Sequence, residues 1–153
     1  MGMKDLIRGK RLYLDTNVLI YLFEGFPTFR HVLTEMTECA DAGEASLFTG
    51  EITIAELMVI PFKKDQPALI KFYMEALEDK RFIKLLPSTQ KVYLKTAYLR
   101  ATQPKMKTPD AIHVATAVEG AMDVFITNDA GIKTPDGLER LLLSDLITAN
   151  PND

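Results

Sequence analysis

Several features that define common protein classes are absent from this sequence. Its single cysteine, Cys39, cannot form a disulfide within the chain, which suits a reducing cytoplasm, and we expect it to pack on a helix. No stretch approaches the roughly 18 uncharged apolar residues that a membrane-spanning helix needs. Charges scattered through the N-terminal segment are unlike the apolar region of a secretory signal. We therefore expect a cytoplasmic protein with no membrane contact.

Net positive charge is absent too. The formal charge of −3 at pH 7 gives no overall field that would attract nucleic acid. If the protein handles nucleic acid, a local basic patch or bound metal ions must provide the attraction. The 153 residues contain no internal repeat, low-complexity tract or long linker, so we predict one domain over 1–153.

The motifs of several enzyme classes are missing as well. No glycine pattern suits a P-loop or Rossmann site, and neither His31 nor His113 belongs to a paired zinc motif. A Cys39 nucleophile would need nearby positive charge, but its charged neighbours in the sequence are acidic. A haloacid-dehalogenase-type phosphatase needs an acid where this chain has Asn17. None of these chemistries is favoured.

The sequence does contain short apolar runs that alternate with segments of helical periodicity. Strands are expected at about 12–14, 45–50, 81–86 and 123–127. Helices are expected at about 18–23, 28–42, 51–60, 67–79, 87–102 and 108–119, the last with Thr108 as N-cap and Pro109 at the first helical position. The tail "LERLLLSDLI" fits either a helix end or an edge strand. This order predicts an α/β fold in which a mainly parallel central sheet of four to five short strands is flanked by helices.

Acidic residues follow two of the expected strands. Asp15 ends the first strand, and Asp129 comes shortly after the strand "VFIT". Functional sites of such folds lie beyond the carboxyl ends of the strands, which favours both carboxylates as site residues. Each also has an ordinary structural interpretation. Asp15 or Thr16 would cap the next helix, and Asp129 would form an Asx turn in "TNDAG".

Glu56 is a third candidate, because it lies on an apolar helix face. In "EITIAELMVI" it shares that face with Ile52, Ala55 and Val59. Either Glu56 is buried with a partner or a metal, or the helix is slightly rotated and Glu56 lies at the edge of the core.

Asp110 is a fourth candidate, at the start of the apolar segment "DAIHVATAV". We expect this helix to pack on the sheet and to carry Asp110 inward, although a favourable contact with the helix dipole would also explain the residue. His113 lies on the same side of the helix and is interpreted as a core or supporting group rather than a ligand.

A cluster of these four carboxylates would need a cation. Two bare carboxylates about 5 Å apart repel by about 3 kcal/mol at an effective dielectric constant of about 20. Three or four together would not all stay ionised unless a cation offset their charge. Oxygen ligands without cysteine or paired histidine select Mg²⁺ or Mn²⁺ over Zn²⁺.

Four sequence blocks, "YLDTNVLIYL", "TGEITIAELMV", "TPDAIHVATAV" and "VFITND", resemble the signature blocks of the PIN-domain ribonucleases, in order and over about 12–129. The resemblance is greatest to the VapC-type toxins of bacterial and archaeal toxin–antitoxin pairs. It implies an acidic quartet and three hydrogen-bonding residues that support it. The quartet is Asp15, Glu56, Asp110 and Asp129, and the supporting residues are Asn17, Thr127 and Asn128. Glu51 is not assigned, because the acidic position of the family matches the residue before Leu57.

The same resemblance implies a metal-dependent endoribonuclease that binds one or two Mg²⁺ or Mn²⁺ ions. As a toxin it would be a homodimer with a cognate antitoxin, docked in an apolar groove near Phe23, Phe26, Phe29 and Val32, unless these side chains simply pack in the core. Three lysines near the acidic positions are candidates for RNA phosphate contacts, namely Lys105, Lys107 and Lys133. Two alternatives stay open: a housekeeping RNA-processing nuclease, and a non-catalytic RNA-binding or scaffold module.

Overall fold

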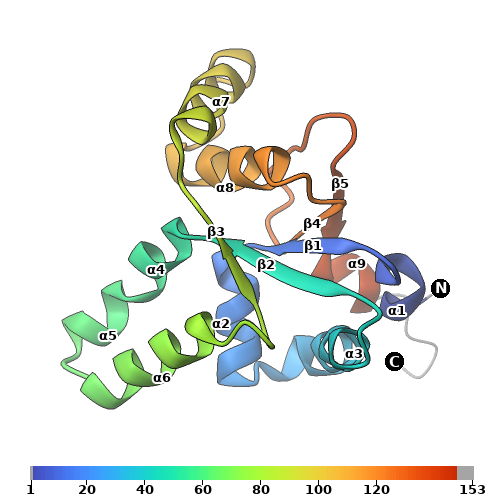
Figure 1. The fold of residues 1–153 in the computed structure, drawn as a ribbon, viewed down its shortest axis with the longest axis vertical. Helices are drawn as coiled ribbons and strands as arrows, with labels where there is room; N and C mark the ends of the chain where they lie inside the picture. The colour runs from blue at the N-terminus through green and yellow to red at the C-terminus, as the bar shows by residue number, and fades with distance from the viewer. Residues whose placement is uncertain (1, 148–153) are drawn as a thin grey trace.

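The computed structural model describes residues 2–147, and within them a five-stranded sheet has the order β3-β2-β1-β4-β5 (Figure 1). Every neighbouring pair of strands is parallel. The strands are β1 (Arg11–Leu14), β2 (Ser46–Gly50), β3 (Lys84–Leu86), β4 (Val124–Thr127) and β5 (Glu139–Leu142). The predicted α/β fold with a parallel sheet is therefore confirmed. The ambiguous tail contains an edge strand and then a short helix.

Helices cover both faces of the sheet (Figure 1). On one face lie α7 (Gln90–Thr102) and α8 (Thr108–Glu119), which pack against each other. The other face carries α2 (Thr16–Glu24), α3 (Arg30–Asp41) and α6 (Pro67–Glu78). Shorter elements complete the described chain: α1 (Met3–Ile7), the 3-10 turn η1 (Pro27–Phe29), α4 (Ile52–Leu57), α5 (Val59–Lys63) and α9 (Leu143–Ile147).

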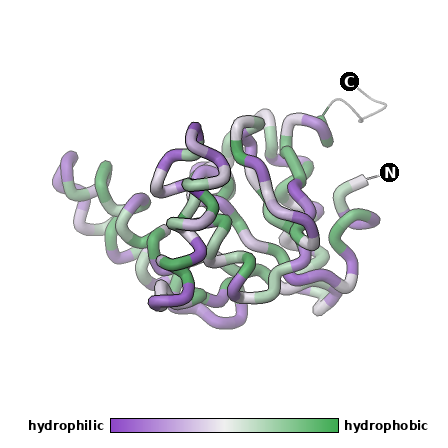
Figure 2. The backbone as a smooth tube through the Cα atoms, turned by 90° about the horizontal axis from the view of Figure 1, so that it is seen from above, coloured by the Kyte–Doolittle hydropathy of each residue, from purple (hydrophilic) through white to green (hydrophobic). Residues whose placement is uncertain are grey.

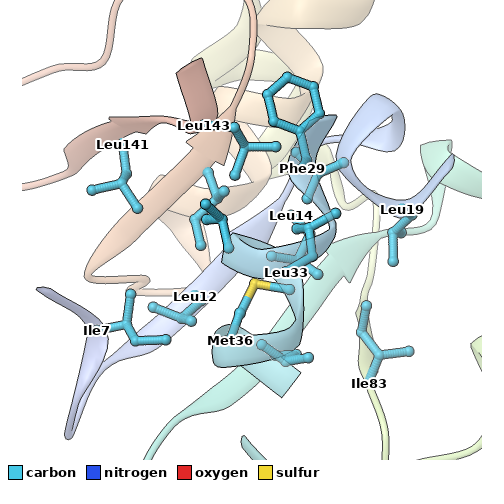
Figure 3. Close-up of a cluster of buried hydrophobic side chains, with 14 of the residues drawn as sticks. Ile7, Leu12, Leu14, Leu19, Phe29, Leu33, Met36, Ile83, Leu141 and Leu143 are labelled. Carbon is cyan, nitrogen blue, oxygen red and sulfur yellow. The ribbon is translucent and has the colours of Figure 1, made fainter. Parts of the chain in front are cut away.

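Alternation along β1 divides the core into two clusters. Leu12 and Leu14 join the cluster under α3, where Figure 3 shows them with Leu33 and Met36. Tyr13 points to the opposite face, because successive side chains of a strand point to opposite sides. Both faces of the sheet are thus buried, which explains why the strands are continuously apolar.

An aromatic row crosses the sheet on the face covered by α8. The strand register aligns Tyr13 with Phe48 of β2 and with Phe125 of β4. The rings of Tyr13 and Phe125 stack with centroids 5.3 Å apart and planes 6° apart. The apolar side of α8 packs on this row through Ala111 and Val114. The row therefore fixes the position of the Tyr13 ring beneath α8.

Several predicted helix boundaries were wrong by one to three residues. The N-cap of α8 is Lys107, so Thr108 is the first helical residue and Pro109 the second. The expected helix at 28–42 is divided into η1 and α3. The helix expected from residue 87 begins at Gln90 and is capped by Thr89, whose hydroxyl accepts from the backbone N–H of Val92. Pro67 does open α6, as predicted.

The predicted apolar face around Glu56 was also wrong. The segment 51–60 contains the separate short helices α4 and α5, and the buried side chains of α4 are Thr53 and Leu57. Ala55 and Val59 are exposed. The predicted face assumed one continuous helix over 51–60. Because α4 and α5 are separate helices, that assumption assigned the wrong face of α4 to the core. Glu56 consequently lies at the edge of the core, the second of the two predicted positions.

The helices α5 and α6 form an arm whose α5 end lies away from the sheet, at the lower left of Figure 1 and on the left of Figure 2, where hydrophobic and hydrophilic residues alternate. Within residues 2–147, no helix is both long enough and apolar enough to cross a membrane.

Candidate active site

Asp15 lies at the carboxyl end of β1 and is also the N-cap of α2. Its Oδ1 accepts a 2.8 Å hydrogen bond from the backbone N–H of Thr16, and its Oδ2 accepts a 2.8 Å bond from the hydroxyl of Thr127 at the end of β4. The residue is only 6% exposed. The predicted cap is therefore confirmed, and the same carboxylate lies at the strand end, where its role in a functional site stays a prediction.

Thr127 connects the two strand-end aspartates. Its Oγ1, which donates to Asp15, also accepts a 3.0 Å hydrogen bond from the backbone N–H of Asp129. Asp129 in turn forms the expected Asx turn, because its Oδ1 accepts from the N–H of Gly131 at 2.8 Å. The loop after β4 is thus held in a conformation that keeps Asp129 beside the strand end.

Glu56 reaches the same region from α4. Its Oε1 accepts a 2.8 Å hydrogen bond from the hydroxyl of Thr16 and lies 2.5 Å from Nε2 of His113. The bond to His113 is the main reason that the pKa of Glu56 is lowered, and partial burial opposes the shift. These contacts hold the side chain of Glu56 in place, and because it is 34% exposed it still contacts solvent.

His113 lies beneath these carboxylates and is 1% exposed. Its Nε2 faces Glu56 and is 3.9 Å from Oδ1 of Asp15, while its Nδ1 is 2.6 Å from the hydroxyl of Tyr13. Burial raises the pKa of Tyr13 far above its usual value, so the phenol stays protonated. His113 is therefore the supporting group that the sequence indicated.

Asp110 lies in the first turn of α8, half-buried above the same edge of the sheet. Burial raises its pKa, and the negative charges of Asp15 and Asp129 raise it further. Glu56 adds a smaller effect in the same direction, and His113 opposes it. Asp15, Asp129 and Glu56 are therefore all close enough to act on Asp110, although the four carboxylates come from separate parts of the chain.

This donor set fits a hard divalent cation. All four candidates are carboxylates, and burial together with the charges of Asp15 and Asp129 raises the pKa of Asp110 despite the opposing effect of His113. Within residues 2–147, no three His, Cys, Asp or Glu side chains form a ready metal cage. Mg²⁺ does not need one, because it keeps several waters and typically binds through one or two carboxylates and substrate phosphates.

The other predicted residues lie around this centre. Asn17 is exposed in the first turn of α2, and Asn128 accepts a 3.1 Å hydrogen bond from the N–H of Ser144, which ties β4 to α9. The three candidate lysines are exposed and, in the described part of the chain, form no ion pair with a carboxylate. Their contacts with RNA stay a prediction. Glu51, which was not assigned, instead accepts from the N–H of Ser88.

Sequence reasoning missed two contributors, Thr16 and Tyr13. Thr16 was considered only as a cap, yet its hydroxyl binds Glu56. The hydroxyl of Tyr13 was the available signal, because a buried polar atom in an otherwise apolar strand needs a partner. Neither partner could be named from spacing, since Tyr13 and His113 are separated by 100 residues.

Solved structures of similar fold come from toxin–antitoxin assemblies. A chain in the structure of VapBC2 from Rickettsia felis bound to a promoter DNA fragment has a TM-score of 0.68 at 15% identity, covering 86% of this chain and 98% of that one. A chain in a toxin–antitoxin complex from Klebsiella pneumoniae gives 0.60 at 25% identity, covering 83% and 94%. DNA-bound VapBC from Salmonella typhimurium gives 0.67 at 17% identity, covering 88% and 98%.

A comparison with curated proteins found no match. The family model of the PIN domain matches residues 12–138, a range that includes all four strand-end and helix carboxylates. Since that match spans most of the 153 residues and the similar structures share the fold, the chain belongs to the PIN-domain family.

Proposed function

We propose that this protein is a Mg²⁺- or Mn²⁺-dependent endoribonuclease and the toxin of a toxin–antitoxin pair in the cytoplasm. One observation carries the catalytic part of the proposal. The carboxylate of Asp110 is placed against the charges of Asp15 and Asp129, with Glu56 nearby, and such crowding is costly unless a cation binds. The PIN-domain match agrees with this assignment.

Asp15 and Asp110 are proposed to hold the metal, with Asp129 completing the shell of a second ion. When bound, one or two ions lower the pKa of a water, offset charge on the scissile phosphate and align the attack. Thr127 and the N–H of Thr16 fix both oxygens of Asp15, so that this carboxylate is oriented before any ligand arrives. Glu56, whose Oε1 is held by two donors, is placed to orient the attacking water and to accept its proton.

RNA would approach across the exposed lysines that flank the acidic edge. Lys105 and Lys107 precede α8, and Lys133 follows the loop that carries Asp129. Their charges would compensate for the acidic net charge of the protein near the scissile phosphate. These contacts bind the phosphate backbone and give no sequence preference by themselves.

The test of the catalytic proposal is cleavage of single-stranded RNA, tRNA and rRNA by the purified protein with Mg²⁺, with Mn²⁺ and with EDTA. We expect cleavage with either metal, none with EDTA, and recovery when metal is added in excess. Single-stranded DNA of the same sequence is the matched control and should stay intact. A folded protein that binds neither metal would contradict the proposed site, and metal binding without cleavage of any RNA would favour the scaffold alternative.

The proposed antitoxin partner has an exposed apolar surface available to it. Phe29 and Val32, two of the residues predicted to flank the groove, are buried in the core. Phe26 is exposed, whereas Phe23 packs against Phe72 of α6.

Exposed apolar side chains gather instead on the α5–α6 arm, namely Val59, Ile60, Phe62 and Phe72. We propose that an antitoxin helix covers this arm. The toxin–antitoxin complex at 25% identity supports a partner of this kind. The family resemblance also supports a homodimer.

Phe62→Ser should weaken binding of the antitoxin at least about tenfold, because truncating an aromatic side chain that anchors the centre of an interface costs about 2 kcal/mol or more. Phe62 is 67% exposed in the unbound chain, so the change should leave stability nearly unaltered. The measurement is calorimetric titration with the product of a small neighbouring gene. Leu94→Ser, an exposed apolar change on α7, is the control. Equal affinity in the two variants would contradict the assignment of the arm.

A further inference from the structure

The hydroxyl of Tyr13 is the polar end of a chain of hydrogen bonds that leads to Glu56. Tyr13 is fully buried, and its ring is fixed by stacking on Phe125. Its Oη accepts a 3.0 Å hydrogen bond from the N–H of Gly50 at the end of β2. It lies 2.6 Å from Nδ1 of His113 on α8. Strand, sheet neighbour and helix therefore meet at one hydroxyl group.

The chemistry of these groups gives the chain of bonds a direction. A backbone N–H can only donate, so the Tyr13 hydroxyl accepts from Gly50 and has its own proton to give. Nδ1 of His113 lies 2.6 Å away, within reach of that proton, and we infer that this nitrogen accepts it. A neutral imidazole whose Nδ1 accepts carries its proton on Nε2, and that N–H then donates to Oε1 of Glu56.

Glu56 is the last member of this chain of hydrogen bonds, and one of its two carboxylate oxygens already has two donors. Its Oε1 accepts from His113 and from the hydroxyl of Thr16, so two donors fix the carboxylate plane. Within residues 2–147, Oε2 has no protein hydrogen bond. The partly exposed carboxylate therefore offers one free oxygen in a single orientation.

The end of β2 is built around the Tyr13 hydroxyl. A Cβ atom added at Gly50 would lie 2.6 Å from that oxygen, closer than real Cβ contacts, and 3.2 Å from Cγ2 of Thr116. Only glycine at this position lets the backbone N–H approach the phenol. This close approach is independent of the contacts at Glu56 and indicates that the position of the hydroxyl matters.

We propose that Tyr13 and His113 are positioning residues: the Tyr13 hydroxyl holds His113 in its Nε2–H tautomer, and His113 thereby fixes Glu56 with Oε2 free for the reacting water. The inference rests on the proposed function, because it gives Glu56 its task. A residue that holds a metal ligand or a catalytic base in its orientation typically contributes about 10- to 100-fold to activity or metal affinity.

The tautomer can be measured without any catalysis. In metal-free protein with ¹⁵N-labelled histidine, two-dimensional NMR spectra should show His113 protonated at Nε2 and unprotonated at Nδ1, with His31→Gln identifying the second histidine. Tyr13→Phe removes the donor to Nδ1, so the fixed tautomer should be lost, whereas Tyr93→Phe, at an exposed tyrosine of α7, should leave it unchanged. Wild-type protein protonated at Nδ1, or an unchanged tautomer in Tyr13→Phe, would overturn the proposal.

Two histidine variants separate positioning from packing. In His113→Gln the longer amide can still donate near the Nε2 position toward Glu56, whereas in His113→Asn it can reach only the position of Nδ1. We expect kcat to fall less in His113→Gln than in His113→Asn, and Tyr13→Phe to lose about 10- to 100-fold in kcat with little change in KM. Thermal unfolding of each variant is measured in parallel. Equal kcat in the two histidine variants, or losses that follow stability alone, would overturn the proposal.

RNA cleavage by Glu56→Gln distinguishes failure of the proposed function from failure of the positioning inference. If Glu56→Gln cleaves RNA as wild type does, the proposed catalytic task of Glu56 fails even where the NMR spectra show the expected tautomer. If Glu56→Gln is inactive but the tautomer is not fixed, the catalytic assignment stands and the positioning inference fails.

Discussion

Replacing Asp110 by Asn should abolish RNA cleavage and at the same time raise the thermal stability of the metal-free protein. Loss of a metal-holding carboxylate removes several kcal/mol of transition-state stabilisation, which corresponds to a rate loss of about 10³-fold or more. The stability gain follows from charge. The pKa of Asp110 is raised in the folded protein, so its ionised form is disfavoured by folding.

The sign of the stability effect follows from linkage. An acid whose pKa is higher in the folded state stabilises the fold below its unfolded pKa and loses that contribution as the pH rises through the folded value. At neutral pH the ionised Asp110 therefore destabilises the metal-free fold. A neutral Asn removes the cost of burying that charge and the repulsion from Asp15 and Asp129. No hydrogen bond contributes to the pKa shift of Asp110, so in the described part of the chain Asn would break none.

Asp15→Asn is the informative contrast, because it should be inactive and less stable. Both oxygens of Asp15 accept hydrogen bonds, from the N–H of Thr16 and from the hydroxyl of Thr127. An Asn amide would turn a donor toward one of these donors, at a cost of about 1–3 kcal/mol. Two inactive variants of one site should thus shift stability in opposite directions.

The measurement combines cleavage assays with thermal unfolding, with and without Mn²⁺. Wild-type protein should gain stability from Mn²⁺, and Asp110→Asn should not. Glu51→Gln serves as the control, since Glu51 lies at the end of β2 but binds the N–H of Ser88. Cleavage retained in Asp15→Asn or Asp110→Asn would reject the site.

Local sequence signals predicted the elements and the edge of the sheet where the site lies. The apolar runs that end at Asp15 and Thr127 correctly indicated buried parallel strands, because only such strands are apolar on both faces. Proline also placed the start of α6 correctly at Pro67. These features depend on neighbouring residues and therefore can be read from a single sequence.

Features that depend on rotation and register could not be predicted. The face of α4 was misassigned because the helix ends at Leu57, with Met58 as its C-cap, and six residues are too few to define a helical period. The tail could not be assigned because it holds β5 and α9 in immediate succession, so both interpretations describe part of it. Likewise, the contacts of Glu56 follow from where α8 crosses the sheet, which spacing alone does not specify.

Replacing Phe125 by Ala should cost about 3–5 kcal/mol of unfolding free energy. Phe125 is fully buried in β4, between the central strand and the edge strand, and its ring stacks on Tyr13. Since domains of this size are stable by only about 5–15 kcal/mol, much of the stability would be lost. Urea unfolding measures the change. Phe62→Ala, at an exposed phenylalanine, should shift stability by no more than about 0.5 kcal/mol.

Phe125→Leu tests whether the aromatic row also serves the site. Leucine keeps most of the volume, so we expect a loss of only about 1–1.5 kcal/mol, but it removes the ring that holds Tyr13 in one plane. Because Tyr13 contacts His113 and His113 contacts Glu56, a loosened ring should lower kcat while the protein stays folded. A Phe125→Leu variant with wild-type kcat would show that the row supports Tyr13 by volume alone. A reduced kcat in a folded variant would instead connect the packing of the sheet to the orientation of the catalytic carboxylate.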